Sequence, residues 1–443
     1  MSFARYPAYK DSGVAWLGEV PGHWEVKRLK QVASHNDETL DDNTDADFEI
    51  LYVDISSVDP MLGITAKEAM PFSAAPSRAR RKVRNGDAIV STVRTYLRAI
   101  ARITNPEDNL IVSTGFAVVR PSPQVHHSFL GYLLTAGFFV DEVISRSVGV
   151  SYPAINASDL MRIAVPVPNY NEQQAIATFL DTETAKIDGL MAEQRALVAL
   201  LKEKRQAVIS HAVTKGLNPA APMKDSGVAW LGEVPGHWEV RAIKHIVSTP
   251  VTDGPHETPD FPDEGIPFVS AEAVSSGSID FNKIRGYISE LDHIKYSQKY
   301  RPQMGDVYMV KSGATTGITA IVETDRDFNI WSPLAVIRCG RSSLPHFVLN
   351  FMRSRHFLEA ITLNWSFGTQ QNIGMGVIEN LAVTVPPIEE QKAIAAYLNH
   401  QTTQLDTLTQ EAQTAIALLQ ERRTALISAA VTGKMDVRAV VAA

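Results

Sequence analysis

Positive charge is concentrated in one stretch of the chain, residues 78–102. The stretch holds eight Lys and Arg residues but a single carboxylate, that of Asp87. Such side chains neutralise nucleic-acid phosphates, and an Arg can also form two hydrogen bonds to the edge of a guanine. A solvated surface is the ordinary alternative for a charge run of this kind. The candidates for nucleic-acid contact in this region are Arg78, Arg80, Arg81, Arg84, Arg94 and Tyr96.

Two polar loops in the second half of the chain have related chemistry. KSGATTG (residues 311–317) follows an apolar stretch, and its backbone N–H groups and hydroxyls could hold a phosphate. SFGTQQN (residues 366–372) contains Gln and Asn amides, which can form two hydrogen bonds to an adenine edge. Each loop taken alone is more often a plain hairpin or a wet surface turn. The candidates from these loops are Lys311, Ser312, Thr315, Thr316, Gln370, Gln371 and Asn372.

Catalytic chemistry has little support in the sequence. The chain has no phosphate-binding G-x-x-x-x-G-K-S/T loop, no G-x-G-x-x-G and no H-E-x-x-H. His126 and His127 have no partner at ligand spacing, and Cys339 has no evident activating neighbour. We therefore expect a non-catalytic chain without a metal site.

Composition limits the class of protein further. The 443 residues carry a net charge of −7 and have a mean hydropathy of −0.07. No apolar run approaches the ~20 residues of a membrane span, and the first residues lack the apolar core of a secretion signal. The single cysteine excludes an intrachain disulfide and a thiolate-cluster metal site. We expect a cytoplasmic protein, in which any surface for phosphate is a local patch because the whole chain is acidic.

The chain contains a long internal repeat. KDSGVAWLGEVPGHWEV occupies residues 10–26 and recurs unchanged at residues 224–240. NEQQAIATFLDTETAKIDGL, from Asn171, is matched by EEQKAIAAYLNHQTTQLDTL, from Glu389, and EKRQAVISHAVT is matched by ERRTALISAAVT. The order is therefore arm, block and long segment, followed by a second arm, block and long segment. Near-identical segments suggest that both copies meet the same kind of partner, whereas divergent blocks suggest different ones.

Each long segment has the apolar spacing of a long helix. A heptad pattern of this length is typical of a helix that pairs with another long helix. We expect these two to pair with each other through Ile176, Leu180, Glu183, Ile187, Leu190, Leu197 and Leu201 in the first segment and Leu398, Leu405, Leu408, Leu419 and Arg422 in the second.

We expect this pairing to be antiparallel. That arrangement relates the two repeats by a pseudo-two-fold axis, the commonest symmetry of paired units. It also brings Glu183 towards Arg422, a favourable charge pair, and Lys204 towards Gln401. About 40 helical residues at ~1.5 Å each form a rod of ~60 Å, with one block expected at each end.

The two blocks differ in sequence but share strand-like stretches, turn signals and a short helix-like run near their ends. Faint echoes, such as NGDAIV (residues 85–90) and MGDVYMV (residues 304–310), indicate one fold with different surfaces. We expect an α+β protein in which two strand-rich domains are separated by two long helices that pair as an antiparallel coiled coil. The expected parts are an arm (1–26), a strand-rich domain (27–165), a central helix (166–216), the repeated arm (217–240), a second strand-rich domain (241–384), a distal helix (385–432) and a tail (433–443).

Taken together, these motifs resemble the specificity subunits of type I restriction–modification systems. The resemblance rests on both arms, on VPPIEEQKAIAAYLNHQTTQLDTL (385–408), on the VTGKMDVR tail (431–438), and on GIPFVSAEAV and FGTQQNI in the second block. It spans nearly the whole chain. It implies two target-recognition domains, each of which reads one half of a split, asymmetric site in double-stranded DNA, and helices that set the spacer.

The resemblance also implies partners. The helices would dock two methyltransferase (modification) subunits, and restriction subunits would join some complexes. S-adenosylmethionine would belong to the modification subunits, and ATP and Mg to the restriction subunit, so this chain would need no cofactor. The block loops would read bases. In the first block, SVGVSYPAI (147–155) takes the place of the Gln-Gln-Asn loop, which suggests apolar or shape-based readout there.

One alternative from another functional class stays open. The chain could be a coiled-coil adaptor that binds proteins with two heads and does not bind DNA. Sequence-dependent retention of DNA would separate the two hypotheses. An enzyme with an unrecognised site has no motif in its favour.

Overall fold

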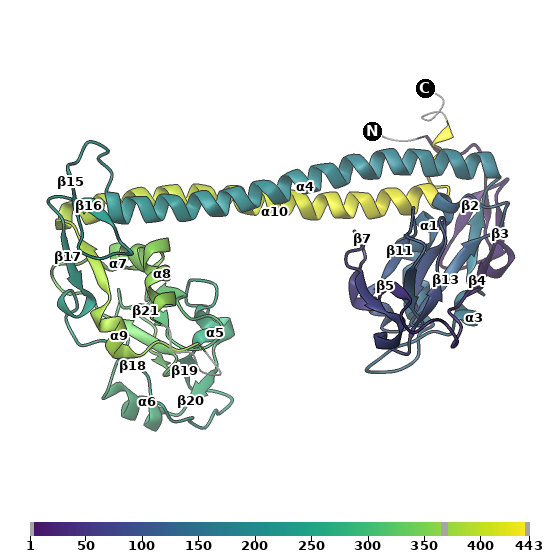
Figure 1. Ribbon diagram of the computed structural model, residues 1–443. Helices are drawn as coiled ribbons and strands as arrows, with labels where there is room; N and C mark the ends of the chain where they lie inside the picture. Colours follow the sequence, from purple (N-terminus) through teal and green to yellow (C-terminus); the bar gives the residue numbers. More distant parts are fainter. Residues whose placement is uncertain (1–3, 365–370, 439–443) are drawn as a thin grey trace. The chain divides into compact units, whose positions relative to one another are not determined.

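The computed structural model describes residues 4–364 and 371–438 (Figure 1). The chain forms two compact units, Met1–Gln194 with Thr414–Ala443, and Arg195–Gln413. Each unit contains one strand-rich domain and one part of each of two long helices, α4 (Tyr170–Lys215) and α10 (Ile388–Val431). The predicted α+β class with two long helices is confirmed.

The first strand-rich domain has two four-stranded sheets. One has the order β11-β10-β13-β4 and is antiparallel, and the other has the order β8-β5-β12-β9, in which β5 and β12 run parallel. The elements before α4 are β1 (Tyr9–Asp11), β2 (Glu19–Pro21), β3 (Glu25–Arg28), β4 (Ala33–His35), β5 (Glu49–Val53), β6 (Val58–Asp59), β7 (Gly63–Ile64), β8 (Glu68–Pro71), β9 (Ala79–Lys82), β10 (Ala88–Ser91), β11 (Ile100–Arg102), β12 (Leu110–Ser113), β13 (Phe116–Pro121), α1 (His127–Thr135), α2 (Gly137–Ser145), α3 (Ala157–Leu160) and β14 (Ala164–Val167).

The second strand-rich domain repeats this plan. Its antiparallel sheet has the order β18-β24-β21-β22, and its other sheet has the order β20-β19-β23, in which β19 and β23 run parallel. The elements between the long helices are β15 (Met223–Asp225), β16 (Glu233–Pro235), β17 (Glu239–Ala242), β18 (Thr252–Asp253), β19 (Ile266–Val269), α5 (Ala271–Val274), β20 (Gly286–Ile288), α6 (Glu290–Ser297), β21 (Val307–Val310), β22 (Thr319–Ile321), β23 (Asn329–Ile330), β24 (Leu334–Ile337), α7 (Pro345–Met352), α8 (Arg355–Leu363), α9 (Met375–Asn380) and β25 (Ala382–Val385).

The two sheets match strand for strand, so the divergent blocks share one fold. The order β11-β10-β13-β4 corresponds to β22-β21-β24-β18, and β8-β5-β12 corresponds to β20-β19-β23. The faint NGD and MGD echo has a structural cause. Asp87 is buried and accepts two hydrogen bonds from Arg120 (2.9 and 2.8 Å), and Asp306 does the same with Arg338 (both 2.7 Å). A buried carboxylate needs such a bidentate partner.

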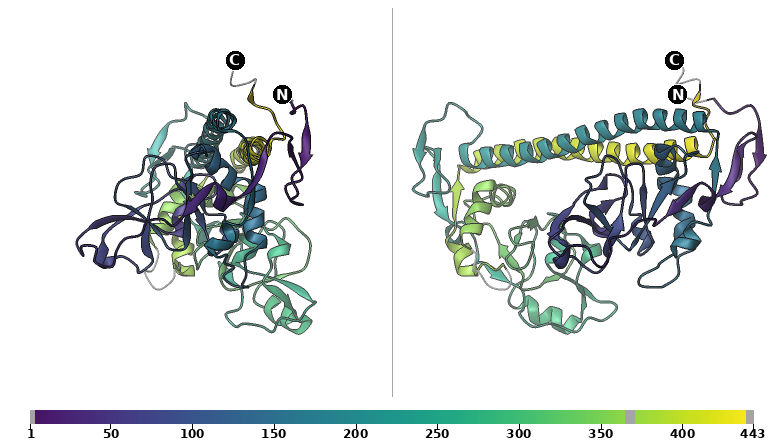
Figure 2. Two further views of the ribbon diagram at one scale, coloured as in Figure 1. Left: turned by 90° about the vertical axis from the view of Figure 1, so that its right-hand side faces the viewer. Right: turned by 45° about the vertical axis from the view of Figure 1, so that its right-hand side comes forward.

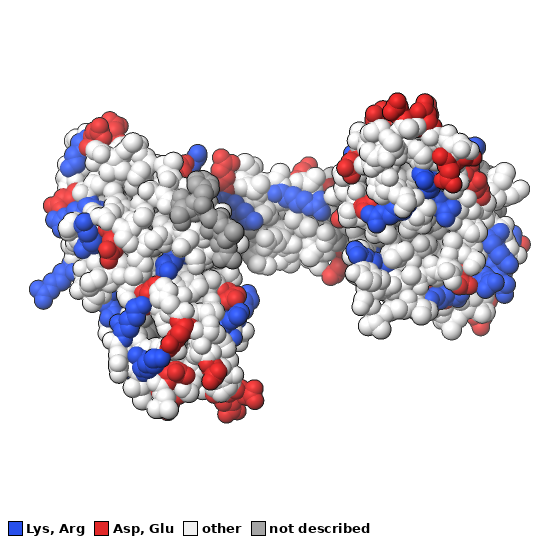
Figure 3. All heavy atoms as spheres, turned by 60° about the horizontal axis from the view of Figure 1, so that its bottom comes forward, with Lys and Arg blue, Asp and Glu red and all other residues white. Residues whose placement is uncertain are grey.

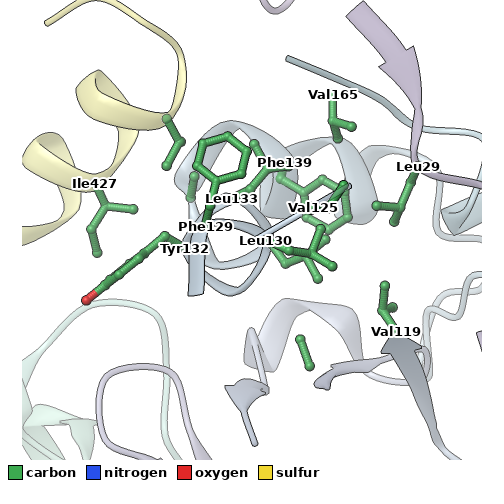
Figure 4. Close-up of a cluster of buried hydrophobic side chains, with 14 of the residues drawn as sticks. Leu29, Val119, Val125, Phe129, Leu130, Tyr132, Leu133, Phe139, Val165 and Ile427 are labelled. Atoms are coloured by element: carbon green, nitrogen blue, oxygen red, sulfur yellow. The ribbon is translucent and has the colours of Figure 1, made fainter. Parts of the chain in front are cut away.

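The core of the first unit forms where α1 and α2 meet the first antiparallel sheet. These helices are apolar on most faces, which is typical of helices that are buried between layers. Figure 4 shows Phe129, Leu133 and Phe139 of these helices close to one another, with Ile427 of α10 on one side. The end of α10 is therefore part of the same hydrophobic core.

Helices α4 and α10 pair antiparallel in each unit. In the first unit, Arg423 Nε donates to Asp188 Oδ1 (2.9 Å) and Nη2 donates to Oδ2 (3.2 Å). In the second unit, Arg205 binds Asp406 in the same way (2.8 and 3.3 Å). The beginning of each helix thus lies beside the end of the other, as predicted.

The apolar residues predicted to pair the two helices, which we call the seam, need a correction at three positions. Leu190, Leu197 and Leu408 are exposed, whereas Met191, one residue further on, is 1% exposed. Ile176, Leu180, Ile187, Leu201, Leu398 and Leu405 are buried as expected, and Leu419 is half-buried. At Leu190 two adjacent apolar residues competed for the seam, and Met191 rather than Leu190 is the buried one. Val198 and Thr409, which follow Leu197 and Leu408, are half-buried.

The predicted charge pair across the helices also involves different residues. Glu183 binds Lys186 on its own helix (2.6 Å), and Arg422 is exposed. The residue after Arg422, Arg423, makes the bond to α4 instead. Lys204 is likewise exposed, and its neighbour Arg205 makes the pair in the second unit. A shift of one residue therefore accounts for both arginines, whereas the carboxylate that pairs with α10 is Asp188 and not Glu183.

A repeated polar clamp fixes the start of each long helix. Gln173 is buried, accepts from the backbone of His126 (2.8 Å) and donates to Pro168 O (2.8 Å). Gln391 makes the equivalent bonds to Leu344 and Pro386 (both 2.8 Å). The preceding glutamates bind a histidine of each arm, and these pairs are His23 with Glu172 (2.9 Å) and His237 with Glu390 (2.8 Å).

The tail after α10 lies against the N-terminal arm (Figures 1 and 2). Tyr9 Oη donates to Gly433 O (2.9 Å), and Asp436 N donates to Ala4 O (2.8 Å). Gly433 has a φ of +71° and lies close to Trp24, and Gly216 has a φ of +77° and lies close to Trp238 after α4. In the second unit this helix end continues directly into the repeated arm.

Candidate nucleic-acid interface

Two loops meet at the same place in both strand-rich domains. In the second unit, the loop after β21 receives the segment before α9, since Gly313 N donates to Gln371 O (3.0 Å) and Ile373 N donates to Lys311 O (2.9 Å). In the first unit, Arg94 N donates to Pro153 O (2.8 Å) and Ile155 N donates to Thr92 O (2.9 Å). The structure thus brings together KSGATTG with the Gln-Gln-Asn segment, and it places SVGVSYPAI at the equivalent position.

The side chains of the loop after β21 are partly used within the protein. Thr316 Oγ1 donates to Gly313 O (2.7 Å) and closes a tight turn, and Thr315 is half-buried. The backbone of Ser312 forms an isolated antiparallel β-bridge with that of Asn372, so this bridge joins the backbones and not the side chains of the two residues. Gln371 and Asn372 are exposed, and Gln370 lies outside the described residues. The exposed amides and the half-buried hydroxyls form one polar surface at this end of the sheet.

Lys311 is anchored by a buried carboxylate. Its side chain is 12% exposed, and Nζ lies 3.3 Å from Asp253 Oδ2. Asp253 also binds Lys299 and His256. Burial acts to raise the pKa of Asp253, but the hydrogen bond from Lys299 and the positive charges of Lys299, Lys311 and His256 outweigh it and hold that pKa below its ordinary value. The ammonium is therefore held in a fixed position rather than free in solvent.

The arginine-rich stretch of the first unit does not form one open basic patch. Figure 3 shows basic and acidic side chains interspersed on the drawn face of each unit. Strand β9, which carries Arg80 and Arg81, has no counterpart among the described strands of the second unit, where α6 lies between β20 and β21. Most arginines of the stretch have polar partners within the protein. These are Arg78 with Tyr52 (3.1 Å) and Asp54 (3.2 Å), Arg80 with Asp42 (3.5 Å), Arg84 with Glu38 (2.7 Å), Arg98 with Asp141 (3.1 Å), and Arg102 with Asp181 (3.0 Å).

Arg81 and Arg94 differ from these ion-paired arginines. Arg81 is half-buried, and its Nε has no hydrogen-bond partner among residues 4–364 and 371–438. Burial lowers the pKa of its guanidinium. Arg94 has a φ of +52° and lies over the ring of Tyr152 at 4.8 Å. Tyr96, two residues further on, is exposed. Arg94, Tyr96 and Tyr152 therefore lie at the loop junction, whereas Arg80, Arg81 and Arg84 lie on or after β9.

The sequence candidates at the junction of the first unit did not name single residues of the loop 147–155, although its apolar character was expected, and the structure shows that Val148 and Val150 are exposed there. One feature was missed altogether, the clamp made by Glu172, Gln173 and their repeats, which gives the unchanged arm a structural role. The Glu-Gln pair at the start of both helices was the sequence signal for this clamp.

The described residues offer no grouping of three or more His, Cys, Asp or Glu side chains that could hold a metal ion. Burial raises the pKa of the Cys339 thiol to about 11, so the thiolate is scarce at neutral pH. In the described ranges, no single helix is long and apolar enough to cross a membrane. The bent pair α1 and α2 meets that test by length and composition, and most of its apolar side chains are buried in the core.

Comparison with known proteins gives a consistent result. A family model described as type I restriction modification DNA specificity domain matches residues 21–198 and 235–417. The EcoKI specificity subunit of Escherichia coli (strain K12) is 23% identical over 72% of this chain and 68% of its own length. Because the family model matches both repeats, it covers most of the chain.

Two solved structures share the fold. A chain from work on complex assembly and conformational transition of the type I R-M system has a TM-score of 0.73 at 24% identity, covering 94% of this chain and 99% of that one. The crystal structure of the HsdS subunit from Thermoanaerobacter tengcongensis has a TM-score of 0.52 at 25% identity, covering 94% and 98%. From the repeated arms, the paired helices, the twofold match of the family model and these likenesses, we conclude that the chain belongs to the DNA specificity subunits of type I restriction–modification systems.

Proposed function

We propose that each strand-rich domain reads one half of a bipartite, asymmetric DNA target and that the paired helices set the spacer between the halves. One observation carries this proposal. The same two-loop junction occurs in both domains with the same backbone hydrogen bonds, but it presents different side chains. Arg94 and Tyr152 lie at the junction of the first domain, and Ser312, Gln371 and Asn372 lie at that of the second. The same backbone arrangement with different side chains is what two domains need if they read two different half-sites.

The repeated parts support a second element of the proposal, the docking of two methyltransferase subunits. Both arms have the same sequence, and both are fixed to a long helix by the same histidine–glutamate pair. Leu190, Leu197 and Leu408 face away from the seam and give the helices an apolar outer surface. Two identical arms, each fixed to a long helix in the same way, could each bind one copy of the same partner. The proposed chain is non-catalytic and holds no cofactor, with S-adenosylmethionine in the methyltransferase subunits and ATP and Mg in a restriction subunit.

The predicted site residues divide by environment. Gln371 and Asn372, with Gln370, are proposed to bond base edges, and Ser312, Thr315 and Thr316 to support them. Arg78, Arg80, Arg84 and Lys311 are each held in place by a carboxylate of the protein. They are proposed to turn towards phosphates when DNA binds, which would fix the register on the duplex. Arg94 and Tyr96 lie at the junction with residues 147–155 of the first unit and are proposed to contact DNA there. The half-buried Arg81 is the weakest candidate because its guanidinium is partly withdrawn from solvent.

A domain exchange tests the proposal. Residues 27–165 are replaced by the corresponding block of another specificity subunit, and the methylated positions in host DNA are mapped by modification-sensitive sequencing. We expect one half of the methylated sequence to change while the other half and the spacer stay the same. The matched control replaces residues 241–384 and should change only the other half. A change in both halves after either exchange would contradict the proposal of one half-site per domain.

The adaptor alternative has one observation in its favour. Many of the arginines proposed for DNA contact already have acidic partners, and the net charge is −7. Gel shift of the chain together with its co-purified methyltransferase on the mapped target and on a scrambled duplex separates the two functions. Preferential retention of the target supports DNA reading, and equal behaviour of both duplexes supports the adaptor.

A further inference from the structure

The loop at the junction of the first unit, residues 147–155, is closed by one antiparallel β-bridge between Val148 and Ala154, and we call it the apolar finger. Val148 N donates to Ala154 O (2.9 Å), and Ala154 N donates to Val148 O (3.0 Å). Its turn requires Gly149, which has a φ of +118° and whose Cβ would lie 3.1 Å from Tyr152 O. Bonds to Thr92 and Arg94 fix the base of the finger to the loop after β10. The finger is therefore a defined element that holds its tip in place.

The tip of the finger presents apolar side chains to solvent. Val148 and Val150 are 80% and 102% exposed, and Tyr152 is 62% exposed. Tyr96, on the loop to which the finger is bonded, is also exposed. Apolar surface in this amount at one place is unfavourable in water and typically marks a binding surface.

The surroundings of the finger indicate what covers it. Arg78, Arg98 and Arg146 near its base each share a carboxylate within the protein. Arg94 has no such partner in the part of the chain that the structure describes, and its guanidinium is held on the Tyr152 ring. A cleft of about 560 Å³ beside the finger is lined by Arg78, Arg94 and Tyr152. An uncompensated cation beside an apolar tip fits an anionic polymer that also exposes apolar groups.

Duplex DNA has these two properties in its major groove. The groove is wide enough for a two-stranded β-ribbon and therefore also for a narrow loop closed by one β-bridge. Its walls carry phosphates, and the thymine 5-methyl group is the apolar feature of its base edges. Valine side chains offer no hydrogen bond to the other base edges, so they cannot read them by donor and acceptor pattern. Contact between a thymine methyl group and a valine side chain, by contrast, removes apolar surface of both groups from water, which is favourable.

We propose that the apolar finger reads thymine in the first half-site by placing Val148 and Val150 against thymine 5-methyl groups, with Arg94 oriented by Tyr152 towards a neighbouring phosphate. This inference rests on the proposed function, since it assumes that the first domain reads DNA. It assigns the base class and the residues that select it. It also separates the two domains by chemistry, with apolar contacts in the first and amide hydrogen bonds in the second.

The test uses the full complex of the chain with its methyltransferase on duplexes carrying the mapped target. Each thymine of the first half-site is replaced in turn by deoxyuridine, which lacks only the 5-methyl group. At one or more positions we expect affinity to fall about fourfold, the effect of one methyl group. Val150→Ala should cause a similar loss on the thymine duplex and little further loss on the deoxyuridine duplex. Because both valine side chains lie in solvent, Val150→Ala and the double variant Val148→Ala/Val150→Ala are expected to fold.

The control variant is Leu291→Ala, another exposed apolar residue, on α6 of the second unit. It should leave the deoxyuridine effect in the first half-site unchanged. The inference is overturned if the first half-site holds no thymine on either strand, if deoxyuridine has no effect at any position, or if its effect adds fully to that of Val150→Ala. It is also overturned if the valine variants lose the methyltransferase but keep the thymine preference. If the wild-type complex shows no preference for any DNA sequence, the proposed function itself fails.

Discussion

Arg423 on α10 binds Asp188 on α4 through two parallel hydrogen bonds of 2.9 and 3.2 Å, and Arg205 and Asp406 make the equivalent pair in the other unit. The two pairs are related by exchange of the helices. In the first unit α10 supplies the arginine, and in the second α4 supplies it. Such a reciprocal arrangement favours the antiparallel register over a register shifted by one turn, in which the charges would not meet.

The Arg423–Asp188 pair gives a first prediction. Arg423 is mostly buried and Asp188 is partly exposed, so the coupling free energy from a double-mutant cycle with Arg423→Ala and Asp188→Ala is expected to be roughly 0.5–1 kcal/mol. Urea unfolding of the four proteins measures it. The adjacent and exposed Arg422→Ala serves as the matched control and should change the free energy of unfolding by less than about 0.5 kcal/mol. A larger effect at Arg422 than at Arg423 would contradict the seam described above.

The polar clamp gives a second prediction. Gln173→Ala removes the acceptor of His126 N and the donor to Pro168 O in a buried place, so the free energy of unfolding of the first unit should fall by about 1–3 kcal/mol. Gln174→Ala, at the next and exposed position, is expected to have little effect. Hydrogen exchange of α1 amides in both variants provides the local readout. Equal protection in the two variants would show that the clamp does not hold α1 to the long helix.

The buried Asp253 gives a prediction about pH. Its pKa is lowered in the folded protein, so its stabilising contribution is complete above the unfolded value of about 3.9 and is lost as pH falls through the folded value. Asp253→Asn should therefore unfold more easily than the wild type at pH 7, and the difference should shrink below about pH 4. Chemical unfolding at several pH values measures the difference. Asp260→Asn, a change at an exposed position in the same loop, is the control and should stay close to the wild type at every pH.

Lys311 gives a prediction about salt. Its anchored ammonium is proposed to contact a phosphate, so Lys311→Ala should weaken DNA binding by the complex and reduce the slope of log affinity against log salt by about 1. Fluorescence anisotropy at several salt concentrations provides both quantities. Identical slopes for variant and wild type would mean that Lys311 serves only to neutralise Asp253.

Much of the fold was predictable because the internal repeat marks both arms and the start of both long helices. The unchanged arm and the matched helix starts led to two long helices, and two long apolar seams led to their pairing. The side of the helix that forms the seam was predicted correctly except at Leu190, Leu197 and Leu408. Met191 and Leu190 are both apolar and adjacent, and the choice between them depends on the partner helix. Local periodicity does not contain that information.

The sequence identified the loops of the candidate site, but it did not predict that these loops lie side by side. The sequence indicated KSGATTG and the Gln-Gln-Asn segment separately, and the fold brought them together through bonds between residues 311–313 and 371–373. The basic stretch was misleading for a physical reason. The acidic partners of Arg78 and Arg84 are Asp54 and Glu38, which lie far away in the sequence, so counting local charges overstated the free positive charge.

The contact between the tail and the N-terminal arm has a practical consequence. In the second unit the chain runs directly from the end of α4 into the repeated arm. In the first unit the end of α10 and the N-terminal arm are held together by noncovalent contacts instead, including the hydrogen bonds from Tyr9 to Gly433 and from Asp436 to Ala4. Ala4 and Asp436 therefore lie in the same unit. A fluorophore attached beside either residue will report on this unit, so a probe for the second unit has to be placed within residues 195–413.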